Sequence, residues 1–307
     1  MLVIFQNIAV IFALVGLGFV ANRTNMLPHS ISPNLTKLLL TVNLPAFILC
    51  SITDNTLTSE TLSEIKQIMI IMLIFYVLGT AVTLLMVKFL RFPRRNRGLY
   101  AAMLLYTNSG FMGIPIASAV FGSHGLFVMV FENIFMTLFL YSAGVMMICM
   151  GNERKLDGKS ILKSFFNYCM LASVLGIVML FAGLSFPAPV SEFLNLVGQM
   201  TVPLSMMLVG MQLGASSIVT LLKKVDLLVF TVVKSTALPA LVYLCLSFTD
   251  VAPMVKTITV LVAALPSAAI IAPLSERYGA DARLAAGGVS LSTLFSMLSI
   301  PIVCALI

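Results

Sequence analysis

Long apolar stretches recur along almost the whole chain, separated by short polar connections. Each stretch has about 20 residues, the length at which an α-helix crosses the hydrocarbon core of a bilayer. The pattern predicts ten such spans, at residues 2–20, 35–52, 68–89, 99–121, 126–150, 165–184, 193–213, 227–248, 255–275 and 284–307. The connections are too short for a separate soluble domain, so we expect an all-α membrane protein with ten transmembrane helices.

The fourth span carries residues that interrupt helices. Its stretch Thr107–Ile116 contains Asn108, Gly110, Gly113 and Pro115. A free backbone amide or carbonyl costs several kcal/mol in hydrocarbon, so a broken helix at that depth is tolerated only where protein or a water-filled cavity covers it. The interruption therefore predicts a functional site.

The ninth span holds a matching stretch, Leu265–Leu274. An offset of 158 residues places Pro115 on Pro273, and the same offset places Pro45 of the second span on Pro203 of the seventh. Paired Gly and Pro interruptions in two halves of a chain indicate a repeat-built transporter with its site near the midplane of the membrane. Proline is also common in membrane helices, so single coincidences are expected.

The distribution of basic residues predicts the orientation. Fifteen of the 18 Lys and Arg residues lie in the odd-numbered connections, and only Lys66 and Lys256 lie in the even-numbered ones. The positive-inside rule then places the odd connections in the cytoplasm and both termini outside the cytoplasmic membrane. Five helices in each half force the second half to insert upside down, so we expect an inverted repeat with halves at 1–150 and 165–307, joined by a cytoplasmic linker at 151–164.

The two interruptions define a candidate binding site. If the fourth and ninth helices cross where both are broken, their polar and small residues would face each other: Asn108, Ser109 and Gly110 against Pro266, Ser267 and Ala268. Half-helix termini aim partial charges at such a crossing, and a carboxamide offers both donors and an acceptor. This cradle suits a carboxylate, although the glycines are equally explained as packing positions.

A few other polar groups lie inside the spans. Asn43, beside Pro45, either lines a pathway or bonds a carbonyl that the proline frees. Glu132, followed by Asn133, is a candidate for carrying a coupled proton; snorkelling or an ion pair with a loop is the alternative. Lys234 either snorkels to the cytoplasmic side or places an ammonium near an anion pathway.

Several function classes find no support in the sequence. The net charge of +7 comes from basic residues at helix ends, which membrane orientation and anionic lipid explain without nucleic acid. The five cysteines lie in apolar runs without metal-ligand spacing, and no nucleophile or phosphate-loop motif is present. We therefore expect no enzyme, metal or cofactor. With 60% hydrophobic residues and a mean hydropathy of +1.09, the chain is also outside the range of soluble proteins.

Several motifs resemble the bacterial branch of the auxin efflux carrier family; they stand at residues 108–116, 43–46, 265–267, 278–281 and 291–294. The resemblance implies a ten-helix inverted repeat similar to the bile-acid sodium symporters and the NhaA antiporters. Helices one, two, six and seven would form a scaffold, often dimeric, and helices three to five and eight to ten a moving transport domain. It also implies small organic anions as substrates, with Asn108 and Pro115 at the crossing and either Pro266 or Pro273 as their counterpart.

These observations together predict a secondary transporter that moves a small carboxylate, such as malonate or an auxin-like acid, by alternating access. Coupling to protons through Glu132 and uniport both remain open. A passive channel or a membrane-embedded ligand sensor without solute flux is the alternative function. The short central connection differs from the long loop of the plant carriers, so auxin itself is not implied.

Overall fold

The computed structural model describes residues 2–27, 31–150 and 167–306. Within these ranges every regular element is a helix, and the one β-type pairing is an isolated antiparallel bridge. Seven helical stretches of the described part are long and apolar enough to span a membrane, and two shorter apolar helices accompany them. The all-helical membrane class is thus confirmed, whereas the ten spans and their inverted repeat stay predictions. The linker expected at 151–164 lies outside the described residues.

The chain forms two compact units, of which the first lies within Met1–Ile68, Gly110–Ile134 and Phe166–Ala215. Its complete elements are α1 (Leu2–Arg23), α2 (Ile31–Leu38), η1 (Leu39–Asn43), α3 (Leu44–Thr53), α9 (Tyr168–Phe181), α10 (Ala188–Gln199) and α11 (Thr201–Ala215). Part of its core is a cluster of Leu39, Leu208 and Met211 where η1 meets α11.

The second unit lies within Met69–Ser109, Phe135–Phe165 and Ser216–Ile307. Its complete elements are η2 (Arg94–Asn96), α5 (Arg97–Leu105), η4 (Leu140–Gly144), α7 (Val145–Cys149), α12 (Ile218–Leu222), α13 (Val225–Val232), η5 (Val233–Ala237), α14 (Leu238–Ser247), α15 (Pro253–Ala264), α16 (Ile271–Tyr278) and α17 (Ala282–Leu306). Three elements contribute to both units: α4 (Ser59–Phe89), η3 (Ser109–Gly113) and α6 (Ile114–Phe139).

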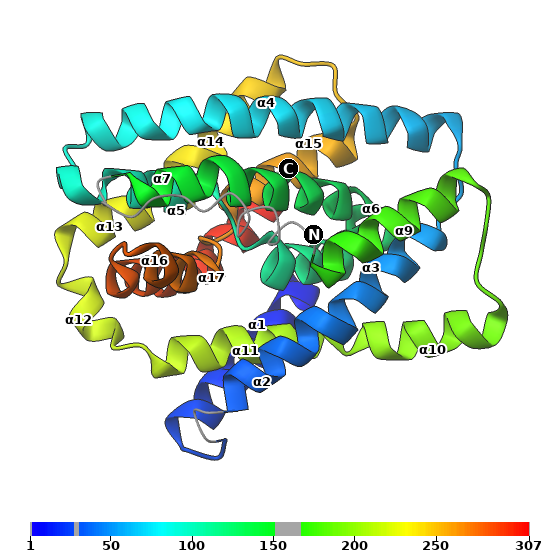
Figure 1. The fold of residues 1–307 in the computed structure, drawn as a ribbon, viewed down its shortest axis with the longest axis horizontal. Helices are drawn as coiled ribbons and strands as arrows, with labels where there is room; N and C mark the ends of the chain where they lie inside the picture. Colours follow the sequence, from blue (N-terminus) through cyan, green and yellow to red (C-terminus); the bar gives the residue numbers. More distant parts are fainter. Residues whose placement is uncertain (1, 28–30, 151–166, 307) are drawn as a thin grey trace. The chain divides into compact units, whose positions relative to one another are not determined.

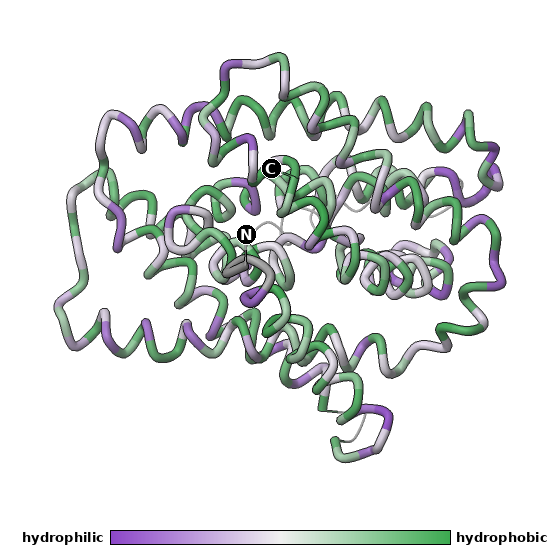
Figure 2. The backbone as a smooth tube through the Cα atoms, turned by 180° about the vertical axis from the view of Figure 1, so that it is seen from behind, coloured by the Kyte–Doolittle hydropathy of each residue, from purple (hydrophilic) through white to green (hydrophobic). Residues whose placement is uncertain are grey.

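Hydropathy follows this architecture. Figure 2 shows hydrophobic residues along the lengths of the helices and hydrophilic residues gathered mainly at their ends and in the turns. In the long helix α4, Ile70, Leu78 and Leu85 are more than half exposed although they are aliphatic. Such exposure is costly in water but suits a side chain that faces lipid.

Helices α1 and α11 of the first unit pack against each other (Figure 1), and glycines lie at their contact. A Cβ added to Gly210 would lie 1.9 Å from the carbonyl oxygen of Val15, and one added to Gly18 would lie 2.1 Å from that of Met207. Gly210 and Gly214 have the GxxxG spacing that lets membrane helices approach closely. This contact was not predicted from the sequence.

Three of the π-helical turns precede prolines. The turns η1, η3 and η5 each end two residues before one, at Pro45, Pro115 and Pro239 respectively. Proline cannot donate the backbone bond of an α-helix, and its ring clashes with the carbonyl four residues earlier. A wider turn with one additional residue relieves both problems. The prolines therefore widen these helices locally into π-helical turns. The turn η4 differs, because no proline follows it.

The α1–α11 contact yields a stability prediction. Gly210→Ala forces two backbones apart, so we expect the free energy of unfolding to fall by about 1–3 kcal/mol. Gly16→Ala is the matched control on α1, because nothing lies within 4 Å of an added Cβ there, and it should leave stability unchanged or slightly raised. Unfolding of the purified protein in detergent measures both; equal effects of the two changes would contradict the close contact.

Candidate functional site

The two predicted interruptions meet in the second unit. Helix α5 ends at Leu105 and η3 begins at Ser109, while α15 ends at Ala264 and α16 begins at Ile271. Between these helix ends the two non-helical segments run antiparallel, with Thr107 bridged to Ser267. Segments 160 residues apart in the sequence thus form a crossover, defined here as residues 106–108 and 265–270.

Two backbone hydrogen bonds fix the register of the crossover. The N–H of Asn108 donates to the carbonyl of Pro266 at 2.8 Å, and the N–H of Ala268 donates to the carbonyl of Tyr106 at 3.0 Å. Asn108 therefore faces Pro266, as expected, but the antiparallel direction places Thr107 opposite Ser267 and Tyr106 opposite Ala268. The sequence indicated no direction for this pairing, and the antiparallel direction gives Ser267 a partner, Thr107, that was not predicted.

The carbonyls at the end of α5 receive new donors. The hydroxyl of Ser267 donates to the carbonyl of Met103 at 2.7 Å, and the ammonium of Lys234 donates to that of Leu104 at 2.6 Å. The last carbonyls of a helix lack intrahelical partners and carry partial negative charge, so a hydroxyl and a cation are suitable caps. The sequence analysis found Ser267 and Lys234 but not their shared target.

Helix α17 supports the crossover from one side. The N–H of Ser267 donates to the hydroxyl oxygen of Ser292 at 3.1 Å, and that hydroxyl in turn donates to the carbonyl of Gly288 at 2.7 Å. Ser292 belongs to a buried run of small hydroxyl residues on α17, which comprises Ser290, Ser292, Thr293 and Ser296. Four hydroxyl residues within seven positions of an apolar span are a signal that sequence reasoning could have used.

An aromatic contact anchors the first half of the crossover. The ring of Tyr106 stacks on that of Tyr76 from α4, with centroids 5.8 Å apart and planes 7° from parallel, and Tyr76 stacks in turn on Phe139. All three residues belong to the second unit. This stack fixes the position of the non-helical segment at the residue that follows α5.

The crossover contains polar side chains without a hydrogen-bond partner among the described residues. The side chain of Asn108 is buried, with 3% of its surface exposed, and makes no hydrogen bond to any described residue. The hydroxyl of Thr107, on the neighbouring position, is likewise buried and unpaired within the described chain. Buried polar groups are nearly always satisfied, so the unpaired hydroxyl of Thr107, next to Asn108, marks a place where a ligand or water completes the bonding.

Lys234 lies within η5 with 1% of its surface exposed. The alternative in which it snorkels to the cytoplasmic side is therefore wrong: the side chain turns inward to the end of α5 instead. Pro266 lies in the break itself, and Pro273 lies in the first turn of α16. Ser109, at the start of η3, is fully buried.

The remaining predicted residues belong to the first unit. Asn43 ends η1 and donates from Nδ2 to the carbonyl of Val197, in the last turn of α10, at 3.0 Å. Val197 is not the residue four positions before Pro45 or Pro203, so this bond is not to a carbonyl that a proline frees, and the role of Asn43 stays a prediction. Its Oδ1 is buried without a partner among the described residues.

Helix α6 carries the acidic candidate. Glu132 is completely buried, so it does not snorkel to the membrane surface. Its neighbour Asn133 is half-buried, and a Cβ at Gly110 would lie 3.7 Å from Asn133 Nδ2, an ordinary contact distance. Gly110 therefore does not mark a close backbone approach. Pro115 stands second in α6, just after the π-helical turn η3.

A polar contact that the sequence analysis missed lies away from these residues in the first unit. Nε2 of His124 lies 2.7 Å from Oε2 of Glu64, a carboxylate in the second turn of α4 that is 7% exposed. The two residues are 60 positions apart, and no local pattern relates them.

The caps of α5 yield a second prediction. Ser267→Ala removes the donor to Met103 and leaves a buried carbonyl unpaired, so we expect the free energy of unfolding to fall by about 1–3 kcal/mol. Ser275→Ala is the control: Ser275 is also fully buried, but its hydroxyl donates only to the carbonyl of Ile271 within its own helix. Detergent unfolding curves of both variants test this. A smaller loss at Ser267 than at Ser275 would contradict a capping role.

Comparisons with known proteins agree with this architecture. The family model described as membrane transport protein matches residues 3–157 and 152–304, nearly the whole chain. An uncharacterized transporter of Methanocaldococcus jannaschii is 23% identical over 95% of both chains, and an uncharacterized transporter of Methanothermobacter thermautotrophicus is 25% identical over 97% of this chain and 96% of its own. The chain is thus a multi-pass membrane protein that belongs to the membrane transport protein family, the auxin efflux carrier family.

Proposed function

We propose that this chain is a secondary transporter that moves a small organic anion, such as malonate or another carboxylate, across the cytoplasmic membrane by alternating access. The observation that carries the proposal is the crossover: two broken helices pair in antiparallel fashion, and the carboxamide of Asn108 stays unpaired beside the pairing. Family membership supports transport as such, and the chemistry of the crossover supports an anion.

Asn108 is the proposed anion ligand. Its carboxamide nitrogen has two N–H donors to offer a carboxylate, and it immediately precedes the first turn of η3, whose N–H groups lack intrahelical acceptors. These amides carry the partial positive charge of a helix N-terminus. The amino group of Lys234, which is cationic when protonated, lies near the end of α5. A carboxylate at Asn108 would therefore meet donors and favourable charge.

Ser267 takes a different role in this proposal. Its hydroxyl donates to Met103 and its N–H donates to Ser292, so both of its donors are used within the protein. We therefore assign Ser267 to holding the crossover rather than to binding the anion. Thr107 offers a hydroxyl that is not used in this way.

Alternating access needs parts that move against each other. We propose that helices three to five and eight to ten carry the crossover while helices one, two, six and seven form a scaffold, with odd connections in the cytoplasm and both termini outside. A homodimer joined through the scaffold is part of this proposal. In the absence of a nucleotide-binding motif, uptake would draw on an ion gradient or on the substrate gradient itself.

The site is tested by Asn108→Ala. We expect uptake of the preferred carboxylate into proteoliposomes to fall at least tenfold, because the variant loses the side-chain donors to the anion. Asn55→Ala is the control: Asn55 lies just after α3, where its side chain donates to the carbonyl of Ser51, and it should transport as the unaltered protein does. Well-folded Asn108→Ala protein that takes up every tested carboxylate normally would refute the proposed site.

The first measurement identifies the substrate. Thermal unfolding of the purified protein is recorded with a panel of mono- and dicarboxylates, because a ligand that binds only the folded state raises the unfolding temperature. Saturable flux with counterflow of the stabilising acid identifies a transporter. Flux that does not saturate would indicate a channel, and binding without flux would indicate a sensor.

The energy source is tested at Glu132. A buried carboxyl inside a span is a candidate proton carrier, and Glu132→Gln keeps its size while preventing ionisation. With proton coupling, an imposed pH gradient drives uptake by the unaltered protein but not by Glu132→Gln, while counterflow at equal pH persists in both. If a pH gradient has no effect on the unaltered protein, transport is uniport, and Glu132 has a structural role.

A further inference from the structure

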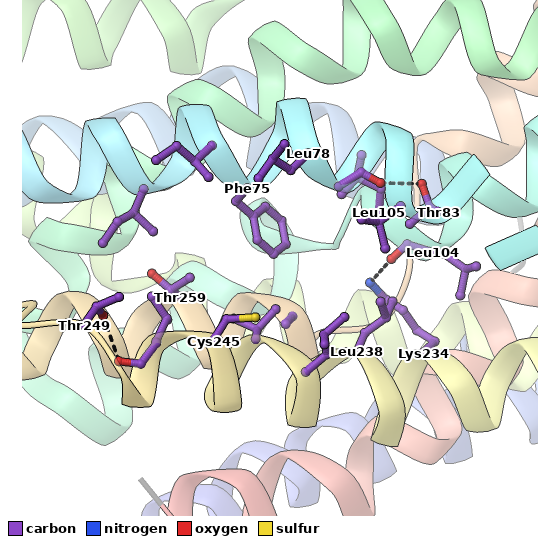
Figure 3. Close-up of a pocket in the computed structure, with 18 of the residues that line it drawn as sticks. Phe75, Leu78, Thr83, Leu104, Leu105, Lys234, Leu238, Cys245, Thr249 and Thr259 are labelled. Carbon is purple, nitrogen blue, oxygen red and sulfur yellow. Dashed lines mark hydrogen bonds between the residues drawn. The ribbon is translucent and has the colours of Figure 1, made fainter. Parts of the chain in front are cut away.

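A second place for a ligand lies within the second unit. A cavity of about 360 Å³ separates α4 from α14, with α15 and the end of α5 closing it. In Figure 3, Phe75 and Leu78 border it from α4, Leu238 and Cys245 border it from α14, and Thr249 lies at the far end from Lys234. The walls are almost entirely apolar, so the tail of a ligand there would be a hydrocarbon or an aromatic ring.

The cavity is reachable from the bilayer. Ile74 and Leu78 on α4 and Leu241 on α14 all line it, and they are 50%, 58% and 43% exposed. These helices belong to apolar stretches long enough to span a membrane, so their exposed aliphatic side chains face lipid. A ligand dissolved in the bilayer can therefore enter from the side.

One end of the cavity carries a positive charge without a counter-ion. Lys234 lines the cavity, and its ammonium donates to the carbonyl of Leu104 (Figure 3). An ammonium has three donors, and no carboxylate of the described residues lies within ion-pair distance of Lys234. A buried cation in an apolar environment is costly unless an anion accompanies it.

We propose that this cavity binds an apolar monocarboxylate, with its carboxylate on the ammonium of Lys234 and its tail between α4 and α14 toward Thr249. At about 30 Å³ for each small heavy-atom group, the space accommodates roughly twelve heavy atoms, the size of decanoate. This site shares the charge of Lys234 with the anion site proposed at Asn108, but Asn108 does not line the cavity, and the cavity site does not depend on the transport proposal. Bound acid would contact the α5 terminus, two residues before the crossover begins.

Binding of radiolabelled decanoate to the purified protein in detergent micelles tests the proposal, with protein-free micelles as the blank. We expect saturable binding of one decanoate per chain. Unlabelled decanoate should displace the label. Decanol, which lacks the carboxylate, and acetate, which lacks the apolar tail, should each compete at least tenfold less well. Absence of saturable binding, or equal competition by decanol, would overturn the proposal.

Two variants locate the bound acid. Lys234→Met removes the charge, and Cys245→Phe fills the apolar part without touching the cap on Leu104; each should weaken decanoate binding at least tenfold. Leu244→Phe is the matched control, because Leu244 neighbours Cys245 on α14, is exposed, and does not line the cavity. If Lys234→Met fails to fold, the comparison of decanoate binding by Cys245→Phe and by Leu244→Phe decides the placement of the acid. Equal binding by these two would overturn the placement.

Asn108→Ala separates this inference from the proposed transport function. The variant should lose uptake of the small carboxylate but bind decanoate with unchanged affinity. If it loses decanoate binding as well, the acid occupies the crossover, and the cavity site is refuted while the transport proposal stands. If uptake is normal and decanoate binding is retained, the proposed transport site fails and the cavity site stands.

Discussion

The constraint on which this structure depends is that hydrocarbon offers no hydrogen bonds to a backbone. A helix that ends within the membrane leaves carbonyls that only the protein can satisfy. At the end of α5, these partners come from two distant parts of the sequence: Ser267 and Ala268 from the other break, and Lys234 from η5. Each break can exist only because the other supplies donors to it, which makes the two interruptions a single structural feature.

This mutual satisfaction separates the polar residues of the crossover into two groups. The hydroxyls of Ser267 and Ser292 donate to backbone carbonyls, and the N–H of Ser267 donates to the hydroxyl oxygen of Ser292. These bonds hold the crossover together. The side chains of Asn108 and Thr107 make no such bonds to the described residues, although they are equally buried. Because leaving a buried polar group unpaired destabilises a protein, the second group is where function is expected to outweigh stability. The same reasoning applies to Lys234, because its ammonium has three donors and the carbonyl of Leu104 accepts one of them.

The sequence was informative where a residue type has one strong physical meaning. Proline, glycine and asparagine within apolar spans located both breaks, and the family resemblance rested on the same residues. The register of the crossing could not be predicted, because hydropathy does not tell whether two short non-helical segments run parallel or antiparallel. Similarly, Lys234 was found as a charge in a span, but whether it turned inward or outward depended on a carbonyl 130 residues away.

The contact of α1 with α11 was missed for a related reason. Gly18 and Gly210 look like ordinary small residues until their partner helix is known. For Gly110 the packing interpretation was wrong, because an added Cβ would meet only ordinary contacts, whereas its place in the binding site stays a prediction.

The π-helical turns have a consequence for how the apolar spans present their side chains. One additional residue in a turn sets every later side chain back by about 100° around the helix axis relative to an uninterrupted α-helix. Beyond η1, η3 and η5, therefore, a helical wheel drawn through the whole span assigns residues to the wrong face. The phase of these helices must be reset at each such turn before lipid-facing and interior positions are distinguished.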